Sequence, residues 1–125
     1  MSVNVSIVMP VGCVREFLPG ALRSVVRQTF REWELIVVDD GVEDTSVADT
    51  IARFNELRIR YLRTSGGEGP AVSRNRALEY VRGAYVAFMD ADDIMLPNRL
   101  EEQVRFLERR ADVDVCAAFA MKVWT

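Results

Sequence analysis

The feature that most constrains the fold is a series of short apolar runs, each ending in residues that form turns. Leu35–Val38, for example, contains only strand-forming residues and stops at Asp39–Gly41. A continuous apolar run of this length is typical of a strand covered on both faces. Between the runs, apolar residues recur at helical spacing. Strands that alternate with helices require crossover connections, so the sequence predicts an α/β fold with a mainly parallel sheet and helices on both faces.

Five strands and four helices are expected along the chain. The predicted strands are Val3–Met9, Leu35–Val38, Ile59–Arg63, Tyr85–Met89 and Val113–Val123. The predicted helices are one of about four turns that begins near Phe17, one capped by Asp44 or Thr45 that runs past Phe54, one over residues 71–82, and one from Pro97 to about Arg110. Because Ile59–Arg63 alternates apolar and basic residues, we expect this strand at an edge of the sheet.

Length and charge exclude several classes of protein. The chain has 125 residues, enough for one domain but not two. Half of the residues are hydrophobic and the net charge is −3, which disfavours disorder, a collagen-like repeat and a coiled coil. An isoelectric point near 5.0 argues against nucleic acid as a partner. With no histidine and two distant cysteines, Cys13 and Cys116, a zinc site and His-dependent nucleophilic catalysis are also disfavoured.

The ends of the chain carry two further expectations. The first ten residues lack a basic segment, and no apolar run approaches the roughly 18 residues of a membrane helix. We therefore expect no membrane segment in this chain and a reducing, cytoplasmic location. The chain stops directly after the apolar stretch Cys116–Trp124, without a polar tail. This favours a chain that is cut within a larger domain.

Five aspartates follow two of the predicted strands. Asp39 and Asp40 come after one, and Asp90, Asp92 and Asp93 after the other. Ligands of an open parallel sheet bind beyond the carboxyl ends of its strands, so we expect these side chains to gather along one edge. Turn formation alone is one explanation. A cation that relieves their repulsion and binds a polyphosphate is the other, and Mg²⁺ or Mn²⁺ suits oxygen ligands.

The common phosphate-binding motifs are absent. The chain contains neither GxGxxG after its first strand nor GxxxxGK[ST]. Its only glycine-rich segment is Thr64–Pro70, followed by Arg74 and Arg76 on the first turns of the third predicted helix. These arginines could face a diphosphate or balance the aspartates. For Arg76, a solvated helix face is the preferred interpretation.

Seven segments together resemble family 2 inverting glycosyltransferases of the Rossmann-like GT-A nucleotide-diphospho-sugar transferase fold. They are Val5–Val11, Phe17–Val25, Gln28–Phe30, Glu34–Gly41, Gly69–Leu78, Gly83–Asp93 and Pro97–Leu100. They follow the family's order and spacing and cover nearly the whole chain. The resemblance implies a nucleotide-sugar donor, commonly a UDP-sugar, bound with Mn²⁺ or Mg²⁺, and transfer of the sugar to an unidentified acceptor with inversion.

The resemblance also implies roles for individual residues. Pro10 and Val11 would lie under the base, Asp40 would accept from the uracil N–H, Arg74 would hold the nucleotide, Asp90 would support the turn, Asp92 would contact the ribose or the metal, and Asp93 would coordinate the metal. The cation would neutralise the charge that develops on the departing diphosphate. The catalytic base of the family comes from the second, acceptor-binding half of the domain, so none is named for residues 1–125.

Three residues depart from the family pattern. Gly12-Cys13 stands where the family usually has an aromatic residue and Asn, which removes a ring that could pack on the base, and Val42 stands in place of a common Ser. Cys13 is interpreted as a plain thiol beside a turn.

A nucleotide-sugar-binding module without catalysis, or an inactive fragment, is the main alternative function. A phosphoacceptor signalling domain is a weaker one. The oligomeric state is not predicted.

Overall fold

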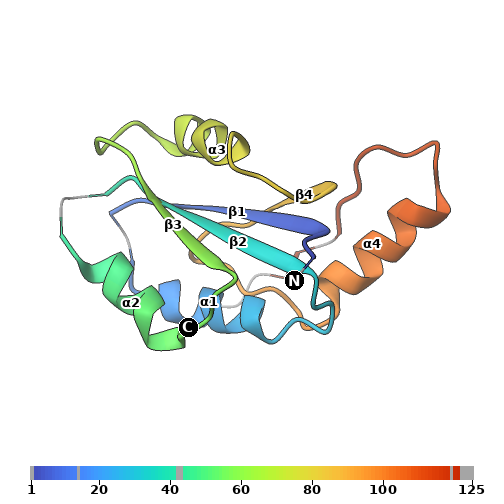
Figure 1. The fold of residues 1–125 in the computed structure, drawn as a ribbon, viewed down its shortest axis with the longest axis horizontal. Coiled ribbons are helices and arrows are strands. Elements are labelled where there is room, and N and C mark those ends of the chain that lie inside the picture. The colour runs from blue at the N-terminus through green and yellow to red at the C-terminus, as the bar shows by residue number, and fades with distance from the viewer. Residues whose placement is uncertain (1, 14, 42–43, 119, 122–125) are drawn as a thin grey trace.

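The computed structural model describes residues 2–13, 15–41, 44–118 and 120–121 (Figure 1). The strands are β1 (Val5–Val11), β2 (Trp33–Asp39), β3 (Ile59–Arg63) and β4 (Tyr85–Phe88), and the helices are α1 (Leu18–Val26), α2 (Ser46–Phe54), α3 (Pro70–Leu78) and α4 (Arg99–Arg109). All strand pairs are parallel and the sheet order is β3-β2-β1-β4. The predicted α/β class is confirmed, as is the place of β3 at an edge.

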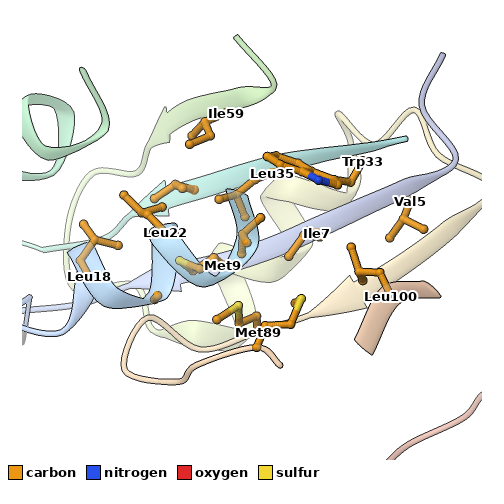
Figure 2. Close-up of a cluster of buried hydrophobic side chains, with 14 of the residues drawn as sticks. Val5, Ile7, Met9, Leu18, Leu22, Trp33, Leu35, Ile59, Met89 and Leu100 are labelled. Carbon is orange, nitrogen blue, oxygen red and sulfur yellow. The ribbon is translucent and has the colours of Figure 1, made fainter. Parts of the chain in front are cut away.

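Alternate residues of the central strands pack into two apolar layers, the larger of which is drawn in Figure 2. Ile7 and Leu35 face the larger layer, which includes side chains of α1, α2 and α4. Val8 and Ile36 face a smaller layer that contains Ala77 of α3. Both layers are completely shielded from solvent at these strand positions. This explains why β1 and β2 are apolar almost throughout, and it confirms helices on both faces of the sheet.

β1 continues through Pro10, although this proline is expected to end the strand. Pro10 pairs in register with Val38 of β2. The carbonyl of Val8 accepts from Met89 N–H, so the backbone of Val8 faces the β4 side, and Pro10, two residues further on, faces the same side. β4 has ended at Phe88. The missing N–H of Pro10 therefore removes no bond of the sheet.

α1 is shorter than predicted, and Gln28, just beyond its end, bonds to the start of α4. The helix ends at Val26 after nine residues. The Gln28 side chain is buried, its Nε2 donates to the carbonyl of Leu96 at 2.6 Å, and its Oε1 accepts from Leu100 N–H at 3.1 Å. This amide thus fixes the start of α4 against α1.

α3 ends at Leu78, four residues before the predicted end. Two residues that are expected at or just after the helix end instead bond to the sheet. Arg82 N–H donates to Glu34 Oε2 at 2.8 Å, and Gly83 N–H donates to Ser6 Oγ at 2.9 Å. Glu34 and Ser6 are buried side chains of the two central strands. They tie the connection between α3 and β4 to the sheet.

The predicted fifth strand is wrong for the part that the structure describes. Residues 113–118 and 120–121 form no strand, and the remaining positions of Val113–Val123 lie outside the described residues. Two exposed apolar side chains, Val115 and Met121, lie in this segment. Strand propensity alone is a weak guide where no neighbouring strand pairs with the segment. Among the described residues, no helix is both long and apolar enough to cross a membrane.

Candidate functional site

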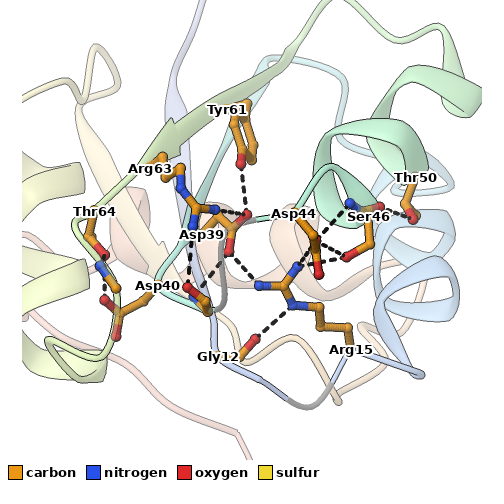
Figure 3. A network of polar contacts seen from close by, with 12 residues as sticks. Gly12, Arg15, Asp39, Asp40, Asp44, Ser46, Thr50, Tyr61, Arg63 and Thr64 are labelled. Atoms are coloured by element: carbon orange, nitrogen blue, oxygen red, sulfur yellow. Dashed lines mark hydrogen bonds and ion pairs between the residues drawn. The ribbon is translucent and has the colours of Figure 1, made fainter.

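Asp39, the last residue of β2, is neutralised by arginines of the chain itself. Its carboxylate is fully buried and lies 2.9 Å from both Arg15 Nη2 and Arg63 Nη1 (Figure 3). Tyr61 Oη donates to Asp39 Oδ2 at 2.7 Å. The expectation that all five aspartates crowd one open edge is therefore wrong for Asp39. Its charge needs no bound cation.

Arg15 joins the turn after β1 to the start of α2. Its Nε donates to the Gly12 carbonyl at 3.1 Å, and its Nη1 donates to Asp44 Oδ1 at 2.8 Å and Ser46 Oγ at 2.6 Å. Asp44 Oδ1 also accepts from the N–H of Ser46, the first residue of α2, at 2.9 Å. A Cβ at Gly41 would lie 1.9 Å from Arg15 Nη2. Arg15 was not predicted as a site residue, and a lone arginine in a turn gives no signal for this role.

Asp40, one residue further, holds the glycine-rich loop. Its Oδ1 accepts from Thr64 Oγ1 and from Glu68 N–H at 2.9 Å, and its Oδ2 accepts from Gly69 N–H at 2.7 Å. Burial alone would raise the pKa of Asp40, but the hydrogen bonds from Thr64, Glu68 and Gly69 lower it below its usual value. A carboxylate offers about four acceptor positions. The bonds from Thr64, Glu68 and Gly69 occupy three of them.

A hollow of about 450 Å³ opens beside Asp40. Its lining consists of Cys13, Asp40, Gly41 and the consecutive residues Arg63–Gly67. These residues follow the carboxyl ends of β1, β2 and β3, where an open parallel sheet binds its ligands. Pro10 and Val11 do not line the hollow. Val11 is buried beneath its edge, and its carbonyl accepts from Asp40 N–H at 2.8 Å.

The loop between β3 and α3 requires its glycines. Gly66, Gly67 and Gly69 have φ angles of 99°, 68° and 93°, in the region that side chains other than that of glycine rarely adopt. Gly67 N–H donates to the Asp40 carbonyl at 2.9 Å. The loop is therefore fastened to the end of β2 by both the main chain and the side chain of Asp40.

Asp90, Asp92 and Asp93 form an acidic cluster after β4. One carboxylate oxygen from each lies within 4.8 Å of the others, and all three residues are exposed. Burial and the charges of Asp92 and Asp90 raise the pKa of Asp93 above its usual value. A divalent cation would offset this repulsion, and three carboxylates are a suitable ligand set for Mg²⁺ or Mn²⁺. The structure thus brings these three predicted residues together.

Arg74 and Arg76 of α3 each form an ion pair with an acidic residue near the site. Arg74 Nη2 lies 3.0 Å from Asp90 Oδ1, so α3 contacts the acidic cluster directly. Arg76 lies 3.0 Å from Glu68 Oε1 in the glycine-rich loop. The Arg76 side chain is 52% exposed, so this pair lies on a solvated face of α3, in line with the preferred interpretation. The acidic cluster does not line the hollow beside Asp40, and β1 lies between β2 and β4.

The sequence pattern of glycosyl transferase family 2 matches residues 6–122. The chain belongs to glycosyl transferase family 2. Among curated relatives of this family, the chain is similar to the UDP-Glc:alpha-D-GlcNAc-diphosphoundecaprenol beta-1,3-glucosyltransferase WfgD of Escherichia coli, with 37% identity over 103 residues. The match covers 82% of this chain and 40% of that relative. The chain thus spans less than half the length of this family 2 enzyme.

Solved structures support the GT-A fold expected for a family 2 chain. S. aureus TarS 1-349 in complex with UDP-GlcNAc is similar with a TM-score of 0.78 and 26% identity, over 86% of this chain and 32% of that one. The mannosyltransferase PcManGT from Pyrobaculum calidifontis, in complex with GDP-Man and Mn2+, has a TM-score of 0.74 and 23% identity, over 86% of this chain and 33% of that one. The second likeness is one of fold alone.

Proposed function

We propose that this chain binds the nucleoside diphosphate of a sugar donor along the carboxyl edge of its sheet. The base would enter the hollow beside Asp40, and the diphosphate would extend towards Asp90, Asp92 and Asp93. The observation that carries the proposal is that Asp40 holds the N-terminus of α3 while Arg74 of the same helix contacts Asp90. The short helix α3 therefore connects the two ends of the proposed site, Asp40 at one end and Asp90 at the other.

Uridine is the base that we propose. The one acceptor position left on Asp40 suits a single imide N–H, and the lowered pKa keeps this side chain an acceptor at neutral pH. A relative whose name specifies UDP-Glc, and a structural neighbour solved with UDP-GlcNAc, support the same base. Pro10 and Val11 would support the base from below, as the resemblance implies.

A divalent cation would act at the acidic cluster. Asp92 and Asp93 would hold it, with Asp92 also within reach of the ribose, and Asp90 would keep the turn in place with Arg74. When bound, the cation would neutralise the negative charge that develops on the departing diphosphate. Mn²⁺ and Mg²⁺ fit this ligand set equally well.

The complete protein would transfer the sugar to an acceptor with inversion. This step needs a general base opposite the diphosphate, and residues 1–125 are not proposed to supply it. A binding module without catalysis remains the alternative, and release of UDP from a UDP-sugar in the presence of an acceptor distinguishes the two.

Thermal unfolding with added nucleotide tests the binding proposal. Ligand at one hundred times its Kd stabilises the folded state by about 2.7 kcal/mol. UDP with Mn²⁺ should therefore raise the melting temperature clearly, while UDP with a chelator should raise it much less. Equal melting temperatures with and without UDP and Mn²⁺, at millimolar concentrations, would contradict the proposal.

A further inference from the structure

The hollow beside Asp40 contains no aromatic side chain among the described residues that line it. A nucleobase is flat and gains much of its binding free energy from a flat partner that covers its face. Of the lining side chains, only those of Asp40 and Arg63 carry planar groups. The oxygens of Asp40 are engaged by the glycine-rich loop, which leaves the guanidinium of Arg63.

Two hydrogen bonds fix the guanidinium of Arg63 in the wall of the hollow. Its Nη1 donates to Asp39 Oδ2 at 2.9 Å, and its Nη2 donates to the Gly41 carbonyl at 3.4 Å. The side chain is nevertheless 27% exposed. Hydrogen bonds to a guanidinium lie in its plane, so the bonds to Asp39 and Gly41 do not occupy its faces. The hydrogen bonds to Asp39 and Gly41 therefore hold the guanidinium of Arg63 in place, and these donors do not point at a ligand.

Residues from three neighbouring strands line the hollow. Asp40 and Gly41 follow β2, Arg63 ends the neighbouring β3, and Cys13 follows β1 on the other side. A ring whose edge donates to Asp40 can be placed with its two faces turned towards β3 and β1. One face would then meet Arg63, and the other would meet Cys13.

On this geometry, and resting on the proposed function, we propose that Arg63 is a specificity-determining residue whose guanidinium stacks on the face of the nucleobase. The charges nearby favour a neutral ring over a phosphate at this place. The charge of Arg63 is already paired with Asp39, and the carboxylate of Asp40 lines the hollow, so an anion there would gain little attraction. A neutral aromatic ring avoids this repulsion and gains a cation–π contact.

Arg63→Lys is the variant that separates stacking from charge. Lysine keeps a positive charge for Asp39 but has no flat group. Arg60→Lys is the matched control: Arg60 lies on the same strand, is 25% exposed, and pairs with the buried carboxylate of Glu34 at 2.9 Å, but it does not line the hollow. By calorimetry, Arg63→Lys should weaken UDP about 3- to 30-fold, whereas Arg60→Lys should bind UDP as the wild type does.

Two probe ligands keep the inference testable whatever the stability of the variants. 5,6-Dihydro-UDP retains the imide edge of UDP but loses the flat aromatic ring. The wild type should bind it several-fold more weakly than UDP, and Arg63→Lys should bind the two about equally. Mn²⁺ with inorganic pyrophosphate should bind the wild type and Arg63→Lys alike.

Three outcomes would count against the stacking role. Unchanged UDP affinity in Arg63→Lys overturns it, as does equal affinity of the wild type for UDP and dihydro-UDP. Parallel loss of UDP and pyrophosphate binding in Arg63→Lys would assign the residue to phosphate instead. A wild-type protein that binds no UDP at all would contradict the proposed function, which is a separate result from these three.

Discussion

The carboxylate of Asp40 accepts a hydrogen bond from Gly69 N–H at 2.7 Å, and Gly69 is the residue that precedes α3. The end of β2 therefore positions the helix whose Arg74 contacts Asp90, 3.0 Å away at the exit of β4. Because two edges of the site depend on one carboxylate, changes at Asp40 should alter both nucleotide binding and folding.

Replacing Asp40 with Asn should destabilise the protein and weaken UDP. Repulsion among aspartates alone would predict a gain in stability, but an amide has one acceptor oxygen, and its NH₂ would face donors of the loop. We expect a loss of about 1–3 kcal/mol in the free energy of unfolding, measured with urea. Asp112→Asn, at an exposed position, is the control. The affinity for UDP should fall more than the affinity for GDP. Equal weakening of both would refute the contact with the uracil N–H.

Replacing Asp93 with Asn should remove the metal-dependent part of UDP binding. The pKa of Asp93 is raised by burial and by Asp92 and Asp90, so its ionised form is disfavoured in the folded state. A neutral amide at this position should therefore not lower the melting temperature in a chelator. Calorimetry of UDP with and without Mn²⁺ measures the effect. If Mn²⁺ still strengthens UDP binding as in the wild type, Asp93 is not a ligand.

Glu34 should make stability fall at acidic pH. Burial alone would raise its pKa, but hydrogen bonds from Ser6, Arg82 N–H and Arg60 hold it below the usual 4.5. A carboxylate with a lowered folded-state pKa contributes stability above its unfolded pKa, and this contribution is lost as the pH falls through the folded value.

Glu34→Gln should therefore cost about 1–3 kcal/mol near neutral pH. The difference from the wild type should shrink as the pH falls below 4.5. Urea unfolding at several pH values measures it, with Glu108→Gln on α4 as an exposed control. A difference that stays constant down to pH 3 would contradict this assignment.

Two glycine substitutions should have opposite effects. Gly67 has a φ of 68° in the loop that lines the hollow, so Gly67→Ala should cost about 1–2 kcal/mol and weaken UDP. Gly20 lies within α1, and a Cβ there would meet nothing within 4 Å, so Gly20→Ala should stabilise by about 0.5–1 kcal/mol. Thermal unfolding compares the two. A Gly67→Ala protein as stable as Gly20→Ala would argue against a strained loop.

The sheet could be predicted from the sequence because β1 and β2 are buried on both faces. A run such as Leu35–Val38 fits no other place in a chain of this size. The ends of α1 and α3 could not be predicted, since they depend on distant partners. The side chain of Gln28, just after α1, bonds to the carbonyl of Leu96. The N–H of Gly83, which follows α3, bonds to the side chain of Ser6.

The acidic cluster could be predicted because its three aspartates lie within four consecutive residues. The arginines around Asp39 could not, since Arg15 and Arg63 are far apart in sequence and become neighbours only through the sheet. The same holds for Thr64 and Glu68, whose hydrogen bonds to Asp40 make this residue a support of the loop as well.

The most direct test of the account is a nuclear magnetic resonance titration that follows both ends of the proposed site at once. UDP should shift the backbone amide signals of Gly41 and Thr64–Gly67, and Mn²⁺ added with UDP should broaden those of Asp90–Asp93 at concentrations too low to broaden them without UDP. UDP shifts that lie elsewhere, or broadening by Mn²⁺ that is indifferent to UDP, would contradict a single nucleotide site along this edge of the sheet.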